Sequence, residues 1–356
     1  MKRKFLKLLT AFFLISLSMP GVSLAMPYSN MFVLGDSLSD VGNAFIATDH
    51  NQIPPLPQLP QDPPYYQGRF SNGPNYAEYL WQHLNLPGDI APSFAGGTNY
   101  AVGGARSRYH TFDGVFDPFF DPLTDPTLFP EFALLGQRDA LLSDMGHALD
   151  PGALYTVWIG SNDVADAFEA LVNGADPSYA NSLLLQSAND LLTVINDLVG
   201  SGAVELLIPN VPNLGLVPEV LDLLPVFPGA QALATGLTQA YNDIVDAGLT
   251  AIMANITRLD TFQFLTDLVS DPALFGLPAS TNVTEACFSG FVGIPGTVCP
   301  NPDEYVFWDK IHPSAVTHQA LGSVAAAAVP EPATIVLIGL GLVGIGYRRH
   351  RSMKAA

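Results

Sequence analysis

The chain has 356 residues, of which 48% are hydrophobic and only 13% are charged. An apolar fraction of this size excludes a disordered chain, and two cysteines with 31 glycines exclude a disulfide scaffold and a collagen repeat. Acids outnumber bases by 33 to 14, and eight of the bases lie within the first seven and the last nine residues. Residues 26–332 therefore carry 33 acids against six bases, a formal balance of −27. Such a body repels phosphate backbones, so we expect no nucleic-acid partner.

Residues 1–25 have the pattern of a secretory signal peptide. A basic start leads into the apolar run 5–17, and the small residues Ser23 and Ala25 occupy the −3 and −1 positions of a cut after Ala25. The alternative is an uncleaved N-terminal anchor.

Export has a consequence for the two cysteines of the chain. It places Cys287 and Cys299 in an oxidising compartment, where we expect them to form a disulfide that closes a short loop. We expect no metal site, because two thiols without a nearby pair of histidines do not complete a tetrahedral shell.

Between the two ends of the chain, short apolar runs alternate with longer helical patterns, as in a parallel sheet with helices on its faces. The short runs predict strands over 31–35, 99–102, 153–160, 203–209 and 256–260. The longer patterns predict helices over 75–86, 132–147, 177–199, 230–254 and 313–328. Five strands separated by crossovers indicate one open, doubly wound sheet, which binds ligands outside the carboxyl ends of its strands.

Two long insertions interrupt this alternation. Residues 49–74 are rich in proline and cannot form a central strand. Residues 112–130 repeat Asp-Pro with Phe, and we expect a solvated acidic loop there. Calcium binding is the alternative, although the loop lacks the Gly turn and the terminal Glu of a known calcium site. Whether its phenylalanines line an apolar pocket or form the loop's own small core stays open.

Polar or glycine-rich turns follow three of the predicted strands. Ser37 stands just past the strand 31–35, where the backbone N–H groups of a following helix stabilise negative charge. Gly103 and Gly104 end the second strand, and a glycine there lets a substrate oxygen approach a backbone N–H. Asn162 follows the third strand and offers a side-chain amide to an oxyanion. Each turn alone is a weak signal, but three at the same edge of a sheet predict a site.

A fourth block supplies an acid and a base. Asp309 and His312 are three residues apart, so the carboxylate can hold one ring nitrogen of the imidazole. The other nitrogen is then left to take a proton from Ser37. A lone histidine before Pro313 would be interpreted as a cap or a surface residue, whereas the pairing with Asp309 favours a catalytic role.

These four blocks resemble the GDSL esterase/lipase family, also called the SGNH hydrolases. The resemblance runs from about residue 32 to residue 328 and maps the four family residues to Ser37, Gly104, Asn162 and His312, with Asp309 completing a triad. It implies a flavodoxin-like three-layer α/β/α fold and an oxyanion hole formed by Ser37, Gly104 and Asn162. It also implies an acyl-enzyme mechanism that needs no metal or cofactor. A standard α/β-hydrolase is disfavoured, because the chain contains no Gly-x-Ser-x-Gly elbow.

The C-terminal residues 329–356 have three parts: a Pro-Glu-Pro triplet, the apolar run 333–347 and an arginine-rich end. At 1.5 Å per residue the run spans about 22 Å, short of the ~30 Å core of a bilayer. The order of the parts resembles a PEP-CTERM sorting tail. That resemblance implies recognition by an exosortase-like transpeptidase, transient membrane contact, and release to the cell surface or extracellular matrix of a Gram-negative bacterium. A plain tail anchor is the alternative.

The predicted organisation is thus a signal peptide at 1–25, a hydrolase domain at 26–328 and a sorting tail at 329–356. We expect a secreted serine ester hydrolase that acts on small-molecule or lipid acyl esters. One alternative is an esterase that removes O-acetyl groups from an exopolysaccharide, or an acyltransferase that passes the acyl group to a second alcohol. Another is a surface or matrix binding protein without activity on the same fold. Acyl-chain length cannot be derived from the sequence.

Overall fold

The protein's computed structural model describes residues 28–48, 58–108 and 130–330. The predicted signal peptide, nearly all of the Asp-Pro loop 112–130 and the apolar run 333–347 lie outside the described residues. Residues 28–329 form one compact unit. Its sheet consists of the parallel strands β1 (Met31–Gly35), β2 (Leu154–Trp158), β3 (Glu205–Pro209) and β4 (Asn255–Leu259), side by side in that order.

The predicted fifth strand, 99–102, requires a correction. This segment lies beside β1 and is hydrogen-bonded to it, with the Tyr100 N–H 2.7 Å from the Val33 carbonyl and the Val102 N–H 3.1 Å from the Gly35 carbonyl. It forms an isolated bridge and not a regular strand. The reason is local: the Gly35 N–H, which the next rung of a parallel ladder would pair with the Tyr100 carbonyl, donates at 2.8 Å to the side-chain oxygen of Gln137.

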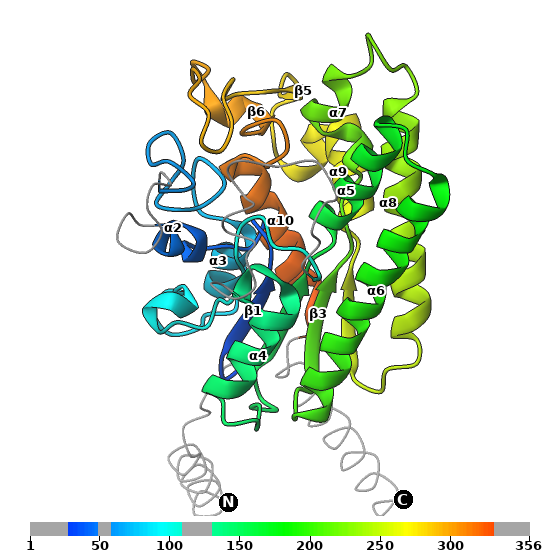
Figure 1. Ribbon diagram of the computed structural model, residues 1–356. Coiled ribbons are helices and arrows are strands. Elements are labelled where there is room, and N and C mark those ends of the chain that lie inside the picture. Colours follow the sequence, from blue (N-terminus) through cyan, green and yellow to red (C-terminus); the bar gives the residue numbers. More distant parts are fainter. Residues whose placement is uncertain (1–27, 49–57, 109–129, 331–356) are drawn as a thin grey trace, which may run out of the picture. The chain divides into compact units, whose positions relative to one another are not determined.

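Helices cover both faces of the sheet (Figure 1). One face packs on α3 (Tyr76–His83), α9 (Thr261–Ser270) and α10 (Ala315–Ala328), and the other packs on α4 (Leu134–Asp144), α5 (Ser161–Val172), α6 (Pro177–Gly200) and α8 (Ala230–Leu249). Each face of the sheet has its own hydrophobic core, and alternate residues of β1 point into each. Met31 and Val33 belong to one core, and Phe32 and Leu34 belong to the other. The predicted three-layer α/β/α fold is therefore confirmed.

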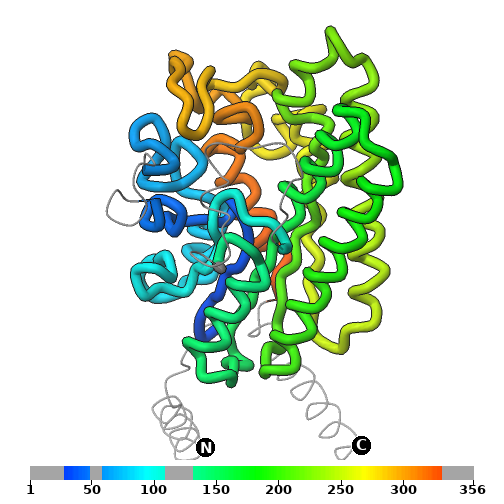
Figure 2. Tube along the Cα trace, in the orientation of Figure 1, coloured from blue at the N-terminus to red at the C-terminus, as the bar shows by residue number. Residues whose placement is uncertain are grey.

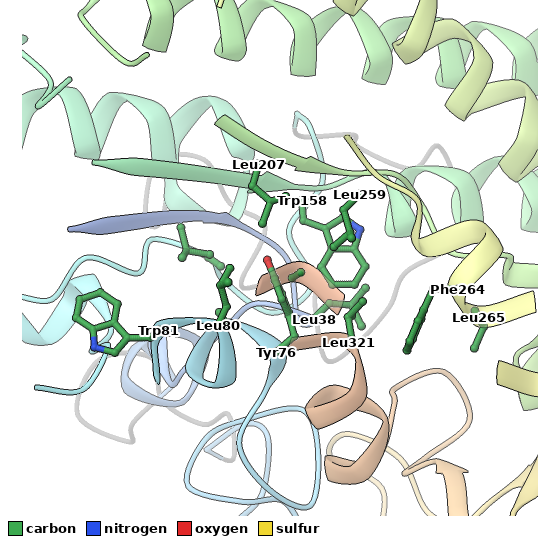
Figure 3. Packing of buried hydrophobic residues seen from close by; sticks show 14 of the residues in the cluster. Leu38, Tyr76, Leu80, Trp81, Trp158, Leu207, Leu259, Phe264, Leu265 and Leu321 are labelled. Carbon is green, nitrogen blue, oxygen red and sulfur yellow. The ribbon is translucent and has the colours of Figure 1, made fainter. Parts of the chain in front are cut away.

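Two of these helices come from distant parts of the sequence and pack against each other. Helices α3 and α10 lie side by side, as the chain trace shows (Figure 2). Asn75 caps α3 in a capping box with Glu78, which explains why the helix begins there. In the core beneath, Tyr76, Leu80 and Leu321 gather under the strands (Figure 3).

The sequence patterns missed several elements. Helix α5 begins where the prediction placed only a turn, and α9 was not predicted. The short helices α2 (Asn43–Ala47) and α7 (Pro218–Asp222) and the strands β5 (Asn282–Ala286) and β6 (Tyr305–Phe307) were also missed. Strands β5 and β6 pair with each other in a separate two-stranded sheet.

Cys287 and Cys299 form a disulfide. It closes a hairpin of residues 288–298, which lies in the sequence between β5 and β6. Among the described residues no helix is both long enough and apolar enough to cross a membrane.

Candidate active site

Ser37 lies in the turn that follows β1. The carboxylate of Asp36 accepts the Leu38 N–H at 3.0 Å and so closes the turn around the serine. Asp36 itself is buried, and burial raises the pKa of its carboxyl to about 7. Ser37 is half-buried, so its hydroxyl borders both the protein interior and the pocket described below.

The structure brings the predicted acid, base and nucleophile together. His312 Nε2 lies 2.9 Å from Ser37 Oγ, and His312 Nδ1 lies 2.7 Å from Asp309 Oδ2. The other carboxylate oxygen of Asp309 accepts the backbone N–H groups of Ile311 and His312, at 2.9 and 2.8 Å. An imidazole held in this way through one nitrogen presents the other to the serine hydroxyl.

Asp309 is fully buried. Burial opposes its ionisation, but the facing His312 and the hydrogen bonds from His312 and Tyr65 outweigh this effect and hold the pKa of Asp309 below its usual value. The carboxylate therefore stays charged in a dry site, where its interaction with an imidazolium is strong.

Tyr65 is the contact of Asp309 that the sequence interpretation missed. Its hydroxyl donates to Asp309 Oδ2 at 2.5 Å, across 244 residues of sequence. The available signal was weak: an aromatic residue in the proline-rich insertion 49–74. No spacing rule connects that residue to the acid.

The structure distinguishes the two glycines proposed as oxyanion donors. The Gly103 N–H donates to Asp40 Oδ2 at 2.8 Å, which favours Gly104 as the donor of the pair. Gly104 has a φ of 80°, a left-handed conformation that glycine adopts without strain. Gly103 is required for packing as well, because a Cβ there would lie 2.0 Å from the ring of Phe70.

Asn162 lies in the first turn of α5. Its side-chain amide donates to the Ala105 carbonyl at 2.8 Å, so Asn162 is fixed next to the Gly104 segment. Arg106 reinforces this link with two hydrogen bonds to Asp166 of α5, at 2.5 and 2.8 Å. The two predicted oxyanion donors from separate strand ends are thus held against each other.

A pocket of about 370 Å³ lies at the nucleophile. Ser37, Asn162 and His312 line it, whereas Gly104 is not among its lining residues. Its walls come from α5, α7, α9 and α10 and are mainly apolar: Val164, Phe168, Val172, Val217, Val220, Leu223, Phe264, Leu265 and Leu321. Two carboxylates, Glu169 and Glu219, also border it, and both are exposed.

Aromatic rings lie against the imidazole. Phe70 is 5.3 Å from the His312 ring between centroids, and Phe291 stacks on it at 6.1 Å with an interplanar angle of 18°. Phe291 belongs to the hairpin closed by the disulfide, so this bridge supports a ring of the site. Neither contact was predicted from the sequence.

Comparison with known proteins agrees with this arrangement. Residues 31–324 match the family model of GDSL-like lipases/acylhydrolases, and residues 328–351 match the PEP-CTERM protein-sorting motif. The family model covers more than half of the chain, so the chain is a member of a family of lipases and acylhydrolases. More particularly, the chain belongs to the GDSL-like lipase/acylhydrolase family, and both predicted resemblances are confirmed. The C-terminal motif indicates exosortase recognition, export and surface sorting in a Gram-negative bacterium.

Individual relatives share less than a third of their residues with this chain. Esterase EstA of Pseudomonas aeruginosa is 29% identical over 366 residues, covering 93% of this chain and 51% of that protein, so the chain spans about half of that relative's length. A phosphatidylcholine-sterol acyltransferase of Aeromonas hydrophila is 25% identical, covering 88% and 93%. Among solved structures, the α/β hydrolase LAE5 from the metagenome of Lake Arreo has 12% identity and a TM-score of 0.41, covering 85% and 97%.

Proposed function

We propose that this protein is a secreted serine ester hydrolase that cleaves acyl esters through an acyl-enzyme on Ser37. The observation that carries the proposal is the continuous hydrogen-bond chain from Ser37 Oγ through His312 to Asp309, with links of 2.9 and 2.7 Å. Nucleophile, base and orienting acid in this order are the requirement for acyl transfer by a hydroxyl.

The geometry supports the following steps. His312 Nε2 takes the proton of Ser37 as Oγ attacks the ester carbonyl. The side-chain amide of Asn162 and the N–H groups of Gly104 and Ser37 stabilise the oxyanion that forms. His312 then gives the proton to the departing alkoxide, leaving an ester between Ser37 and the acyl group. Water repeats the sequence, releases the acid and restores the serine.

The pocket at Ser37 favours an apolar acyl group. Its walls bear valine, leucine and phenylalanine side chains from four helices, and burying an alkyl chain there releases about 25 cal/mol per Å² of apolar surface. The carboxylates of Glu169 and Glu219 beside it repel an anionic group, so we expect the alcohol part of the substrate to be neutral or cationic. An acetyl group would leave most of the 370 Å³ unfilled.

Transfer to a second alcohol is the alternative that a specific observation favours. One relative that covers most of this chain is named as an acyltransferase. An acyl-enzyme is attacked by water or by an alcohol, whichever is better placed, so the same residues support either reaction. Removal of acetyl groups from an exopolysaccharide is less favoured, because the pocket is apolar.

Hydrolysis of p-nitrophenyl esters of increasing chain length by the purified protein tests the proposal. Turnover should rise from acetate to longer chains, and Ser37→Ala should lower kcat by a factor on the order of 10⁴ or more. Ser182→Ala, at an exposed serine of α6, is the matched control. Equal turnover by wild type and Ser37→Ala would remove the proposal and leave a binding protein. Added acceptor alcohol that yields a new ester would assign the transferase reaction, and preference for acetylated glycan would assign the deacetylase.

We further propose that the exported protein is cut after Ala25, which leaves the hydrolase domain at 26–328. The apolar run 333–347 contacts the membrane only until the tail is removed. Removal of the tail then releases the protein to the extracellular matrix. The sorting motif at 328–351 supports this order of events. The intact mass of the protein recovered from the cell surface tests it. A mass that includes both ends would contradict it.

A further inference from the structure

Tyr65 completes the hydrogen bonding of the triad acid. Asp309 Oδ1 accepts two backbone N–H groups, and Oδ2 accepts both His312 Nδ1 at 2.7 Å and the Tyr65 hydroxyl at 2.5 Å. Two bonds on each oxygen fill the capacity of a carboxylate, which is about four. The tyrosine and the imidazole therefore share one oxygen of the acid.

The surroundings of this pair keep water away. Asp309 is 0% exposed and Tyr65 is 1% exposed. The tyrosine ring packs edge-on against Phe288 and Trp308, with centroids 5.7 and 6.2 Å away. Burial and the facing Asp309 raise the pKa of Tyr65 far above its usual value, so the hydroxyl keeps its proton and donates to Asp309 at neutral pH.

We propose that Tyr65 is a positioning residue for the reaction: its hydroxyl fixes the orientation of Asp309 and takes up part of the negative charge that His312 would otherwise receive. This inference rests on the proposed function. A carboxylate with one donor fewer is a stronger acceptor, and it stabilises the imidazolium more. Removing the tyrosine hydroxyl therefore strengthens the attraction of Asp309 for a protonated His312, and it leaves three hydrogen bonds instead of four to fix the orientation of the acid.

Other ionisable groups face the same pair and remain in place when Tyr65 changes. Asp36 on the nucleophile turn and His318 on α10 interact electrostatically with His312. Glu219 on α7 interacts with Asp309 and His312, and with Lys310 as well. A change in pH dependence on replacing Tyr65 alone is thus assigned to its hydroxyl.

The test is Tyr65→Phe, which removes one oxygen and retains the ring. Tyr100→Phe is the matched control, because Tyr100 is also buried and also donates to an acid, Asp144 at 2.8 Å, outside the triad. In Tyr65→Phe the acid limb of the kcat/KM profile should move upward by about one pH unit. Its kcat should fall on the order of tenfold, the scale of outer hydrogen bonds that orient a reacting group, with KM unchanged. Tyr100→Phe should leave both at wild-type values.

A second measurement does not depend on turnover. The imidazole of His312 is titrated by NMR in Ser37→Ala and in the double variant Ser37→Ala/Tyr65→Phe, and the double variant should titrate at higher pH. A wild-type profile in Tyr65→Phe, or identical titrations in this pair, would overturn the role of Tyr65. Inactivity of the wild type would instead refute the proposed function, while the NMR comparison would still decide the role of Tyr65.

Discussion

His318 gives the fold a pH dependence that can be worked out from one hydrogen bond. It lies on α10, is 1% exposed, and its Nδ1 accepts the Tyr76 N–H of α3 at 3.3 Å. Protonation of Nδ1 would replace this acceptor by a donor. Burial lowers the pKa of His318 from 6.5 to about 3, and the neighbouring His312 adds to the effect.

The sign follows from which state binds the proton. Between pH 6.5 and about pH 3 the unfolded chain binds a proton at this side chain and the folded chain does not. The stability that His318 confers is therefore complete above pH 6.5 and is lost as the pH falls through this window. On going from pH 7.5 to pH 4.5 the free energy of unfolding should fall by about 3 kcal/mol because of this residue alone.

His318→Asn isolates this contribution. Asparagine places an oxygen acceptor near the position of Nδ1 and cannot take up a proton in this range. The free energy of unfolding is measured by urea denaturation at pH 7.5 and at pH 4.5 for both proteins. The variant loses packing at both pH values. The difference in its free energy of unfolding between pH 7.5 and pH 4.5 should nevertheless be smaller than that of the wild type by about 3 kcal/mol.

Other buried acids do not obscure the comparison. Burial raises the pKa of Asp36 to about 7 and that of Asp40 to about 6, so these acids oppose His318 by making the fold more stable as the pH falls. They are present in both proteins and cancel in the difference. An equal change in stability for wild type and His318→Asn would refute the reasoning.

Two further predictions concern the oxyanion donor and the disulfide. Asn162→Ala should lower kcat by about 10²–10³ with little change in KM, because the amide acts on charge that develops only in the transition state; an effect confined to KM would argue for substrate binding instead. Replacing Cys287 and Cys299 by serine should lower the free energy of unfolding in urea by about 3 kcal/mol and also reduce turnover, because the hairpin carries Phe291. Reducing agent should have the same effect on the wild type and none on the variant, and full turnover without the bridge would contradict the coupling.

The sequence predicted which candidate site residues come together better than it predicted their surroundings, for a physical reason. Ser37 and Asn162 follow runs that are strands, Gly104 follows a segment that lies parallel to β1 without being a regular strand, and parallel segments bring their carboxyl ends to one edge. The pairing of Asp309 with His312 is local in sequence, so its geometry could be anticipated from spacing. The contact between Ser37 and His312 follows from the fold and not from any spacing rule, since 275 residues separate them.

The missed elements depend on contacts between distant segments. Helix α5 begins directly after a strand end, and its first residues gave the pattern of a turn, which hid the helix behind it. The apolar pocket combines α5, α7 and α9, three helices that were not predicted, so its walls could not be derived from periodicity. Tyr65 belongs to a proline-rich insertion in which no regular pattern exists to indicate burial.

The residues that bury Asp309 explain why these irregular segments matter for the proposed catalysis. Asp309 follows β6, and its neighbour Trp308 belongs to neither of the two large cores on the faces of the sheet, so other residues must keep water away from the acid. A third buried cluster does so, formed by Tyr65 and Phe70 of the insertion, Phe288 of the disulfide hairpin and Trp308 beside the acid. In a dry site an ion pair between carboxylate and imidazolium is several times stronger than in water. The sheet therefore determines where the reacting groups meet, and the insertions determine how strongly the acid acts on the base.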